Sequence, residues 1–205
     1  MHRFGVVFVL GMIALTMPSS ARADPRYPDW PCAQAKVPGL SVGAMWDGPS
    51  IEGVGDSWQD DPKLKDLVAF AAARRTPLDA AQKAITDFIA KTPAADKERT
   101  ATKLFGGLFD TLDQQRNEVM HGIERVSRNE EELASRIKSD VETLHQLEDA
   151  PNQDQSKVND LASQVEWSTR IFEDRRKTIR YVCEVPGTIE QRLFALARVI
   201  RRNLN

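Results

Sequence analysis

Two histidines in the sequence could hold a metal ion, because each follows a glutamate by three residues. The pairs are Glu118 with His121 and Glu142 with His145. In di-iron helical bundles, two such pairs come from different helices and meet at one metal centre. Here both pairs fall in one stretch that we expect to be a single helix, and their separation of 24 residues corresponds to about 36 Å. A shared centre would require a break near residues 127–129, so the sequence favours surface histidines and no bound metal or other cofactor.

The two cysteines, Cys32 and Cys183, are the other residues that could do chemistry. If the chain enters an oxidising compartment, two lone cysteines are predicted to form a disulfide. Separate buried thiols and a redox pair are the alternatives, but nothing resembles the C-x-x-C motif of redox proteins. A bond within one chain would close a loop of about 150 residues, for which the chain-entropy model gives about 5 kcal/mol. The sequence leaves open whether the bond lies within or between chains.

Other features argue against an enzyme and against a nucleic-acid partner. The sequence has no H-E-x-x-H motif, no phosphate-binding glycine loop and no dinucleotide-binding fingerprint. A serine nucleophile needs a neighbouring base, and both histidines that could serve are expected on the outside of one helix. The chain carries 28 Lys and Arg against 30 Asp and Glu, a balance unlike that of proteins that neutralise many phosphates. Hydrolase and oxidase functions are therefore disfavoured.

The N-terminus has the pattern of a secretory signal peptide. His2 and Arg3 precede an apolar run over residues 4–17, and Ala21 and Ala23 give a small-x-small cleavage site. Cleavage after Ala23 would release a periplasmic or secreted protein. The apolar run is shorter than the 20 or so residues of a membrane span, and no later stretch is uniformly apolar, so we expect no transmembrane segment.

Residues 24–61 are predicted to form an irregular strap. Closely spaced prolines and glycines exclude helix over most of this segment. Three of the four tryptophans, Trp30, Trp46 and Trp58, also lie there. Large rings at irregular spacing favour packing into grooves of a helical body. A ligand or partner site lined by these tryptophans is the alternative.

From residue 62 onwards the pattern is helical. Asp61-Pro62, Thr76-Pro77 and Thr92-Pro93 each resemble a helix start, in which a capping residue precedes proline in the first turn. Around residues 104–112 the third helix is apolar on two adjacent faces and contains Gly106 and Gly107. We therefore expect the first two helices and the last one to gather there, with close approach of another backbone or a local kink at the glycines.

The third helix continues without proline to residue 150, with apolar residues at steps of three, four or seven. After Pro151 and Asn152, the same rhythm resumes and extends to residue 182. These stretches predict a coiled-coil-like antiparallel hairpin over residues 113–182, followed by a last amphipathic helix over residues 188–204. The predicted seam of the first arm contains Leu104, Leu108, Leu112, Val119, Ile123, Val126, Leu133, Ile137, Val141, Leu144 and Leu147.

Charge is distributed unevenly along this hairpin. Residues 129–160 carry nine acidic and three basic side chains, whereas residues 166–205 carry nine basic and five acidic. A solvated surface explains such runs in most proteins. The functional alternative is orientation on a protein partner or on an anionic membrane surface through Arg170, Arg175, Arg176, Lys177 and Arg180. Glu173 and Asp174 interrupt this basic set.

These features together predict an all-α protein with one helical domain over residues 62–205, a long hairpin and an N-terminal strap. An extended two-helix arm offers area without a cleft, which suits protein recognition better than catalysis. We expect an exported protein that binds or assembles with an envelope protein, or with itself, through the hairpin. A periplasmic small-ligand or metal-binding protein that uses the strap is the alternative.

Overall fold

The computed structural model describes residues 24–204, and over this range the chain forms helices and turns without a β-strand. The predicted signal peptide, residues 1–23, lies outside the described residues. The predicted all-α class is confirmed. The elements are α1 (Val42–Met45), the 3₁₀ turn η1 (Gly55–Trp58), α2 (Pro62–Ala72), α3 (Leu78–Lys91), the 3₁₀ turn η2 (Ala94–Asp96), α4 (Lys97–Glu148), α5 (Gln155–Val182) and α6 (Val185–Arg202).

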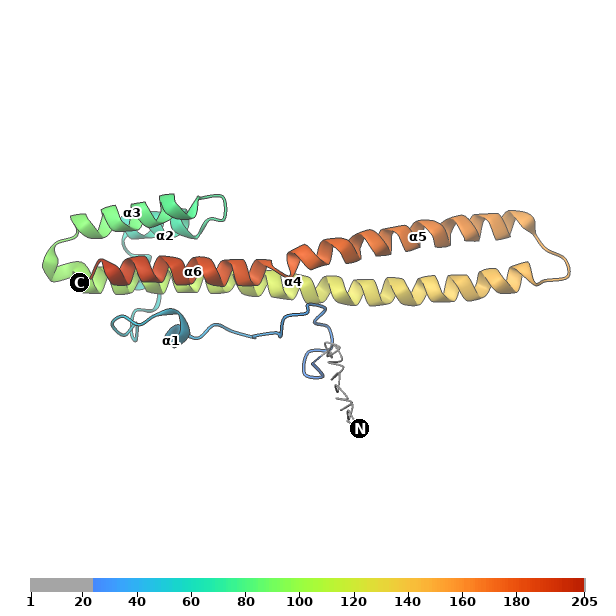
Figure 1. The fold of residues 1–205 in the computed structure, drawn as a ribbon, viewed down its shortest axis with the longest axis horizontal. Coiled ribbons are helices and arrows are strands. Elements are labelled where there is room, and N and C mark those ends of the chain that lie inside the picture. The colour runs from blue at the N-terminus through green and yellow to red at the C-terminus, as the bar shows by residue number, and fades with distance from the viewer. Residues whose placement is uncertain (1–23, 205) are drawn as a thin grey trace, which may run out of the picture.

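The longest element of the molecule is α4, whose 52 residues span about 78 Å. Figure 1 shows α5 and α6 running back along it, one after the other, so that α6 covers its first half and α5 its second half. Polar contacts mark this antiparallel register: Asp140 meets Gln164, Glu130 meets Arg175, and Arg116 meets Glu190. The predicted hairpin therefore exists, and its return arm continues almost directly into the last helix.

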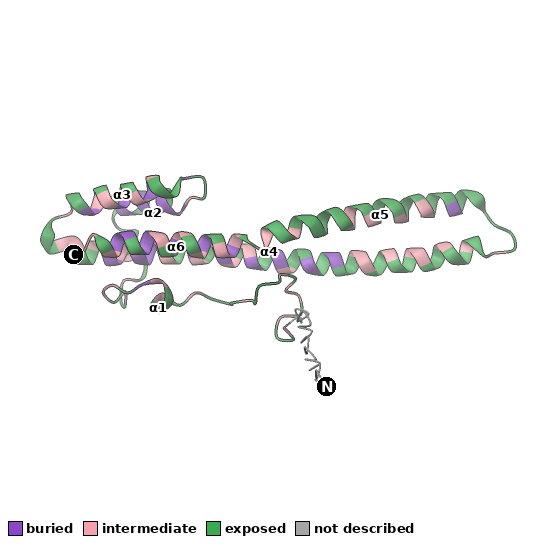
Figure 2. Cartoon of the chain, viewed as in Figure 1, coloured by how far each residue is buried: buried purple, intermediate pink, exposed green. Residues whose placement is uncertain are grey.

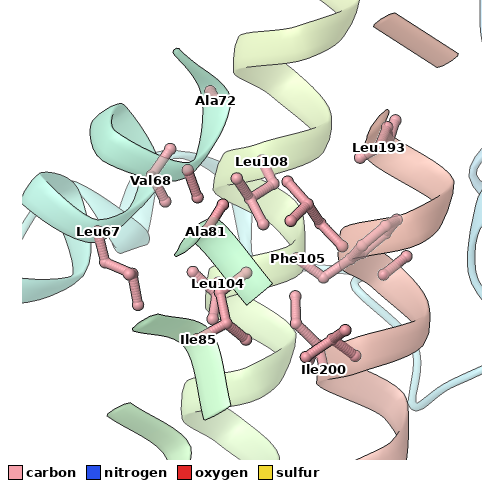
Figure 3. Close-up of a cluster of buried hydrophobic side chains, with 14 of the residues drawn as sticks. Leu67, Val68, Ala72, Ala81, Ile85, Leu104, Phe105, Leu108, Leu193 and Ile200 are labelled. Atoms are coloured by element: carbon pink, nitrogen blue, oxygen red, sulfur yellow. The ribbon is translucent and has the colours of Figure 1, made fainter. Parts of the chain in front are cut away.

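The hydrophobic core lies where α2 and α3 cover α4 and α6. Leu104, Phe105 and Leu108 of α4 are fully buried there, as expected for a helix that is apolar on two faces (Figure 3). Burial falls steeply along the molecule: buried residues concentrate in this body, whereas α5 is mostly exposed or half-buried (Figure 2). As predicted, α2, α3 and α6 pack together around the first part of α4. The distal part of the hairpin consists only of α4 and α5 packed side by side.

The helix starts differ from one another although their sequences look alike. Asp61 caps α2, since its Oδ1 accepts from the backbone N–H groups of Lys63 (2.9 Å) and Leu64 (3.4 Å). The predicted cap at Thr92 is wrong. Its hydroxyl donates back to the Phe88 carbonyl of α3 at 3.1 Å, and η2 intervenes before α4 begins. Since α4 begins at Lys97 with Asp96 at its N-cap position, Thr92 lies too far from the first turn of α4 to cap it.

The junction between α5 and α6 also differs from expectation. The last helix begins at Val185 rather than at residue 188, because Pro186 occupies its first turn, where no intrahelical N–H bond is required. Only Cys183 and Glu184 separate the two helices. The return arm is therefore bent at one point, and this point carries the cysteine.

The strap runs along α4 and packs side chains against the paired glycines, where another backbone or a kink was expected. Trp46 is buried and stacks on Phe105, with ring centroids 4.4 Å apart. A Cβ atom added to Gly107 would lie 2.7 Å from Cδ2 of Trp58. The approach at this point is thus made by side chains of the strap and of α2, not by another backbone.

The seam of the arms follows the 3.6-residue period of a straight helix more closely than predicted. Its buried positions on α4 pass through Arg116, Met120, Ser127 and Glu130. Val126, which was assigned to the seam, is 38% exposed. The valine lies one position beside the true seam and borders the groove described below.

Candidate interaction surface on the hairpin

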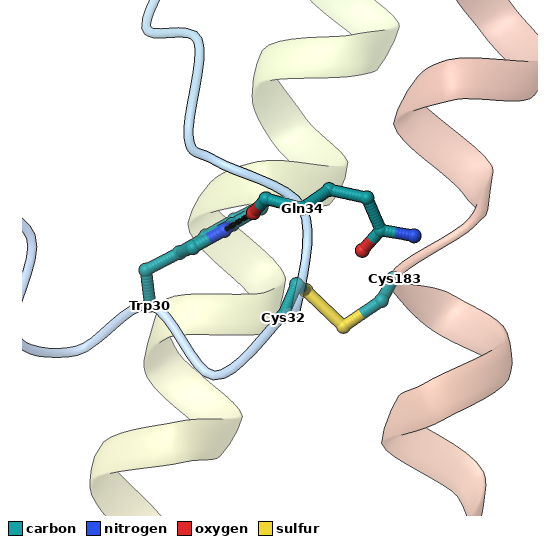
Figure 4. Close-up of a disulfide and its surroundings, with 4 residues drawn as sticks. All are labelled: Trp30, Cys32, Gln34 and Cys183. Carbon is teal, nitrogen blue, oxygen red and sulfur yellow. Dashed lines mark hydrogen bonds between the residues drawn. A yellow bond between two sulfur atoms is a disulfide. The ribbon is translucent and has the colours of Figure 1, made fainter. Parts of the chain in front are cut away.

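The disulfide joins Cys32 of the strap to Cys183 at the bend between α5 and α6 (Figure 4). The Cα atoms are 5.6 Å apart, and the bond links residues 151 positions apart within one chain. This pairing decides the question that the sequence left open. Beside it, the Trp30 indole N–H donates to the Gln34 carbonyl at 2.7 Å and closes the turn that carries Cys32.

The three strap tryptophans do not converge on one site. Trp46 lies in the core with its indole N–H bonded to the Pro49 carbonyl, and Trp58 packs against Gly107. Trp30 lies farther along α4, near the disulfide and Arg116. Two of the three rings are thus engaged in packing against the body, and Trp30 borders a cavity that also contains the buried charge of Arg116.

The predicted basic residues of α5 are divided between opposite flanks of the arm. Arg175 reaches Glu130 across the hairpin at 3.2 Å and borders one groove. Arg176 and Arg180 border the other flank, near Pro31 of the strap. Arg170 pairs with Glu166 along its own helix at 2.8 Å. They do not form one continuous basic patch.

Both Glu-x-x-His pairs lie on the unbroken helix α4 and are exposed. Glu118 and His121 lie one turn apart near the body, and Glu142 and His145 lie near the tip. The helix has no break between them, so the pairs cannot meet at one centre. Within residues 24–204 no group of three or more His, Cys, Asp and Glu side chains is placed to hold a metal ion.

One serine lies in a catalytic-looking pattern that the sequence interpretation overlooked. Ser41 is the centre of Gly39-Leu-Ser-Val-Gly43, which matches the G-x-S-x-G of hydrolase nucleophile elbows. That motif works at a strand-to-helix turn with a histidine alongside. Ser41 instead is exposed before the four-residue α1, while His121 and His145 lie on the exposed surface of α4. The required strand is missing from the described part of the chain.

An apolar groove of about 610 Å³ lies between α4 and α5, next to the body. Its floor is mainly aliphatic, and its rim carries three arginines and one aspartate. The loop between α2 and α3 supplies Arg74, so this groove is bounded by the body as well as by both arms. The lining residues are Arg74, Val119, Gly122, Ile123, Arg125, Val126, Asp174, Arg175, Thr178, Ile179, Val182 and Val185.

The position of this loop is fixed by a half-buried arginine of α6. Arg192 donates from Nε to the Ala71 carbonyl at 2.8 Å and from Nη2 to the Thr76 carbonyl at 2.9 Å. These bonds satisfy carbonyls at the end of α2 and in the following loop, where the helix offers no N–H partner. Burial lowers the pKa of the Arg192 guanidinium. The loop that carries Arg74 and Arg75 is thus held against the base of the arm.

Two large aromatic side chains are exposed on α5, and sequence reasoning missed both. Trp167 is 63% exposed and Tyr181 is 75% exposed. Trp167 shares a helical stripe with Asp174 and Thr178, which line the groove. The sequence did contain a signal: Trp167 lies in the middle of the return arm but outside its apolar rhythm, which runs through Val158, Leu161, Val165, Phe172, Ile179 and Val182. Neither ring lines the groove itself, but by helical position both project from the side of α5 that carries Asp174 and Thr178. We call the groove and these two rings together the outer flank.

A second recess of about 620 Å³ lies under the strap, beside the disulfide. Arg116 borders it and is only 2% exposed, donating to Glu190 Oε1 at 2.5 Å and to the Val37 carbonyl at 2.6 Å. Its Nη1 has no hydrogen-bond partner among the described residues. Trp30, Glu184 and Glu190 also line this recess.

Comparison of this chain with family models, with curated proteins and with solved structures finds no match. Over residues 24–204, none of the helices combines the length and the apolar character that a membrane crossing requires.

Proposed function

We propose that this chain is an exported, non-enzymatic protein that recognises or assembles with another protein of the cell envelope, or with itself, through its hairpin. The N-terminal pattern and cleavage after Ala23 support delivery to the periplasm or beyond. The Cys32–Cys183 disulfide supports an oxidising compartment, since such bonds are rare where thiols are kept reduced.

The outer flank is the observation that carries this proposal. A groove with an aliphatic floor and a charged rim is the usual anatomy of a protein-binding surface, with an apolar centre and a polar edge. Exposed tryptophan and tyrosine are the side chains most enriched among residues that dominate binding energy. Trp167 and Tyr181 are exposed on the side of α5 whose residues Asp174 and Thr178 line the groove.

Photo-crosslinking in cells that export the full chain tests this proposal. A photoreactive amino acid would replace Val126 or Trp167 on the outer flank, and Asp66, exposed on α2, would serve as the control position. We expect discrete crosslinked species from positions 126 and 167 and none of them from position 66. Absence of crosslinks from both flank positions, at normal protein levels, would refute recognition through the hairpin.

A second candidate function is the binding of a small molecule under the strap. The observation that favours it is the recess beside Trp30, which holds a buried guanidinium with one unpaired nitrogen. A ligand with a hydrogen-bond acceptor would fit Nη1 of Arg116. Native mass spectrometry of the protein purified from its exporting host would detect a stoichiometric ligand, which should be lost in Arg116→Met. A ligand-free spectrum of the wild type would exclude this candidate.

A further inference from the structure

The two exposed aromatic residues of the outer flank are evenly spaced about Asp174, and this spacing suggests a binding partner. Trp167 and Tyr181 are 14 residues apart on α5, and 14 residues rotate a helix by about 40° less than four full turns. The two rings therefore project from nearly the same face of α5. Asp174 lies midway between them and on the same face, where it lines the groove.

We propose that the outer flank binds the outer flank of a second copy of this chain, antiparallel, about a two-fold axis beside Asp174. This inference rests on the proposed function and names its partner. In an isologous pair the same patch occurs on both subunits, so each contact is made twice. An axis beside residue 174 brings Trp167 of each copy to Tyr181 and Thr178 of the other, at the mouth of the apolar groove.

Charge complementarity favours the antiparallel arrangement. The same axis brings residue 160 of one copy to the level of residue 188 of the other. At that level Arg74 borders Val119, and Arg75 shares a recess with Val119 and Ile189. Asp160 is exposed and lies on the Trp167 stripe, seven residues before it. An acidic tip thus meets the basic loop of the partner, whereas a parallel pair would place the two acidic tips together.

The two Asp174 side chains at the two-fold axis do not prevent this pairing. Two Asp174 carboxylates would approach one another there, but each is already paired with Lys177 of its own chain at 3.1 Å. As for the area, α5 spans about 42 Å and is about 10 Å wide, so one helix face offers about 400 Å². This is about half of the roughly 800 Å² per partner found in stable complexes, so the flank of α4 has to supply the other half.

Sedimentation equilibrium of the purified, oxidised chain tests the pairing, with concentrations up to about 100 μM. We expect a monomer–dimer equilibrium for the wild type and at least a tenfold weaker dimer for Trp167→Ser, since central aromatic residues dominate such interfaces. Phe194→Ser is the matched control. Phe194 is also an exposed aromatic residue, but it lies on the strap side of α6, seven residues before Arg201, which faces Asp47. Its loss should leave the dimer unchanged.

Exchanging the charges of residues 160 and 75 tests whether the two copies pair antiparallel. Asp160→Arg and Arg75→Asp should each weaken the dimer, and the double variant should restore it. A wild type that stays monomeric over the whole range, or a dimer that is indifferent to Asp160→Arg and Trp167→Ser, would overturn the pairing. A monomer in solution together with crosslinks from position 167 to other proteins would overturn self-pairing alone. Absence of those crosslinks would instead refute recognition by the hairpin.

Discussion

At the residue scale, Gly107 shows how the strap depends on a single missing methyl group. In a helix interior, alanine is more favourable than glycine by about 1 kcal/mol. At Gly107 the added Cβ would approach Trp58 Cδ2 to 2.7 Å and Val68 Cγ2 to 2.9 Å. Both neighbours belong to packed side chains, so the local gain is outweighed by crowding.

We predict that Gly107→Ala lowers the free energy of unfolding by about 1–3 kcal/mol, the usual range for an overpacked core. Gly122→Ala is the control on the same helix, because a Cβ there meets only Arg125 Nη2, at 3.9 Å. That control should raise the free energy of unfolding by about 0.5–1 kcal/mol. Chemical denaturation followed by circular dichroism measures both. Equal effects of the two substitutions would show that Trp58 does not occupy this position.

The ion pair between Arg116 and Glu190 could not be predicted from the sequence. Arg116 falls at a seam position of α4, where the apolar rhythm of the neighbouring residues suggests another aliphatic side chain. The strap supplies the Val37 carbonyl and α6 supplies Glu190. Buried charge of this kind is retained only when such partners surround it. The partners come from segments far apart in sequence, so spacing along one helix could not reveal them.

At the element scale, the seam of the hairpin contains a polar interruption. Ser127 and Glu130 are buried between the arms, and Oε2 of Glu130 has no hydrogen-bond partner among the described residues. Its other oxygen accepts from Arg175, whose side chain is about half exposed. A solvated arginine compensates a buried carboxylate only in part. This level of the arm is therefore less stable than an aliphatic seam would be.

We predict that Glu130→Leu raises the free energy of unfolding by about 1 kcal/mol, because it buries apolar surface and removes an incompletely paired charge. The neighbouring Glu132 is exposed, and Glu132→Leu should leave stability within about 0.5 kcal/mol of the wild type. Denaturant titration of the two variants provides the comparison. A loss of stability in Glu130→Leu would mean that the Glu130–Arg175 pair supports the arm.

The elements themselves were largely predictable from local signals. Asp61-Pro62 is a capping residue followed by proline, and Pro151 with Asn152 breaks an otherwise continuous helix. The start of α6 was placed three residues late, because proline tolerates a first helical turn as well as a helix end. Val126 was assigned to the seam wrongly, because neighbouring residues on a helix point in directions about 100° apart and the apolar residue of this pair is not the one that faces α5. The buried seam position is the polar neighbour, Ser127.

The outer flank could not be predicted from the sequence. Its groove is bounded by both arms and by the loop at Arg74, and that loop is held by Arg192 from a helix more than one hundred residues later. The disulfide was predictable as a pair because only two cysteines are present. Its position at the bend between α5 and α6 was not, since the bend depends on how the return arm passes from the hairpin to the body.

At the scale of the whole molecule, the disulfide fastens the strap to the base of the hairpin. It links residues 151 positions apart, and the loop it closes includes α2, α3 and both arms but not α6. Long loops have much conformational entropy in the unfolded chain, and a crosslink removes part of it. The native contacts of the strap, such as Lys36 with Glu124 and Asp29 with Arg128, remain available without the bond.

We predict that the double variant Cys32→Ser/Cys183→Ser keeps its helix content but loses about 2–5 kcal/mol of unfolding free energy. Reduced wild type serves as the control and should match the double variant. Circular dichroism with denaturant titration, with and without a reductant, makes the measurement. If the oxidised wild type and the double variant unfolded at the same denaturant concentration, the crosslink would not contribute to the stability of the fold.

The function that we propose depends on whether the outer flank is covered inside the cell. Thiol labelling of single added cysteines in intact cells measures this most directly, because Cys32 and Cys183 are already bonded. Thr178→Cys lies on the groove, and Glu173→Cys lies on the same helix, on the side shared with Arg176 and Arg180. We predict that position 178 is protected in cells and position 173 is labelled, while both react alike in dilute purified protein. Equal labelling of the two positions in intact cells would contradict recognition through this flank.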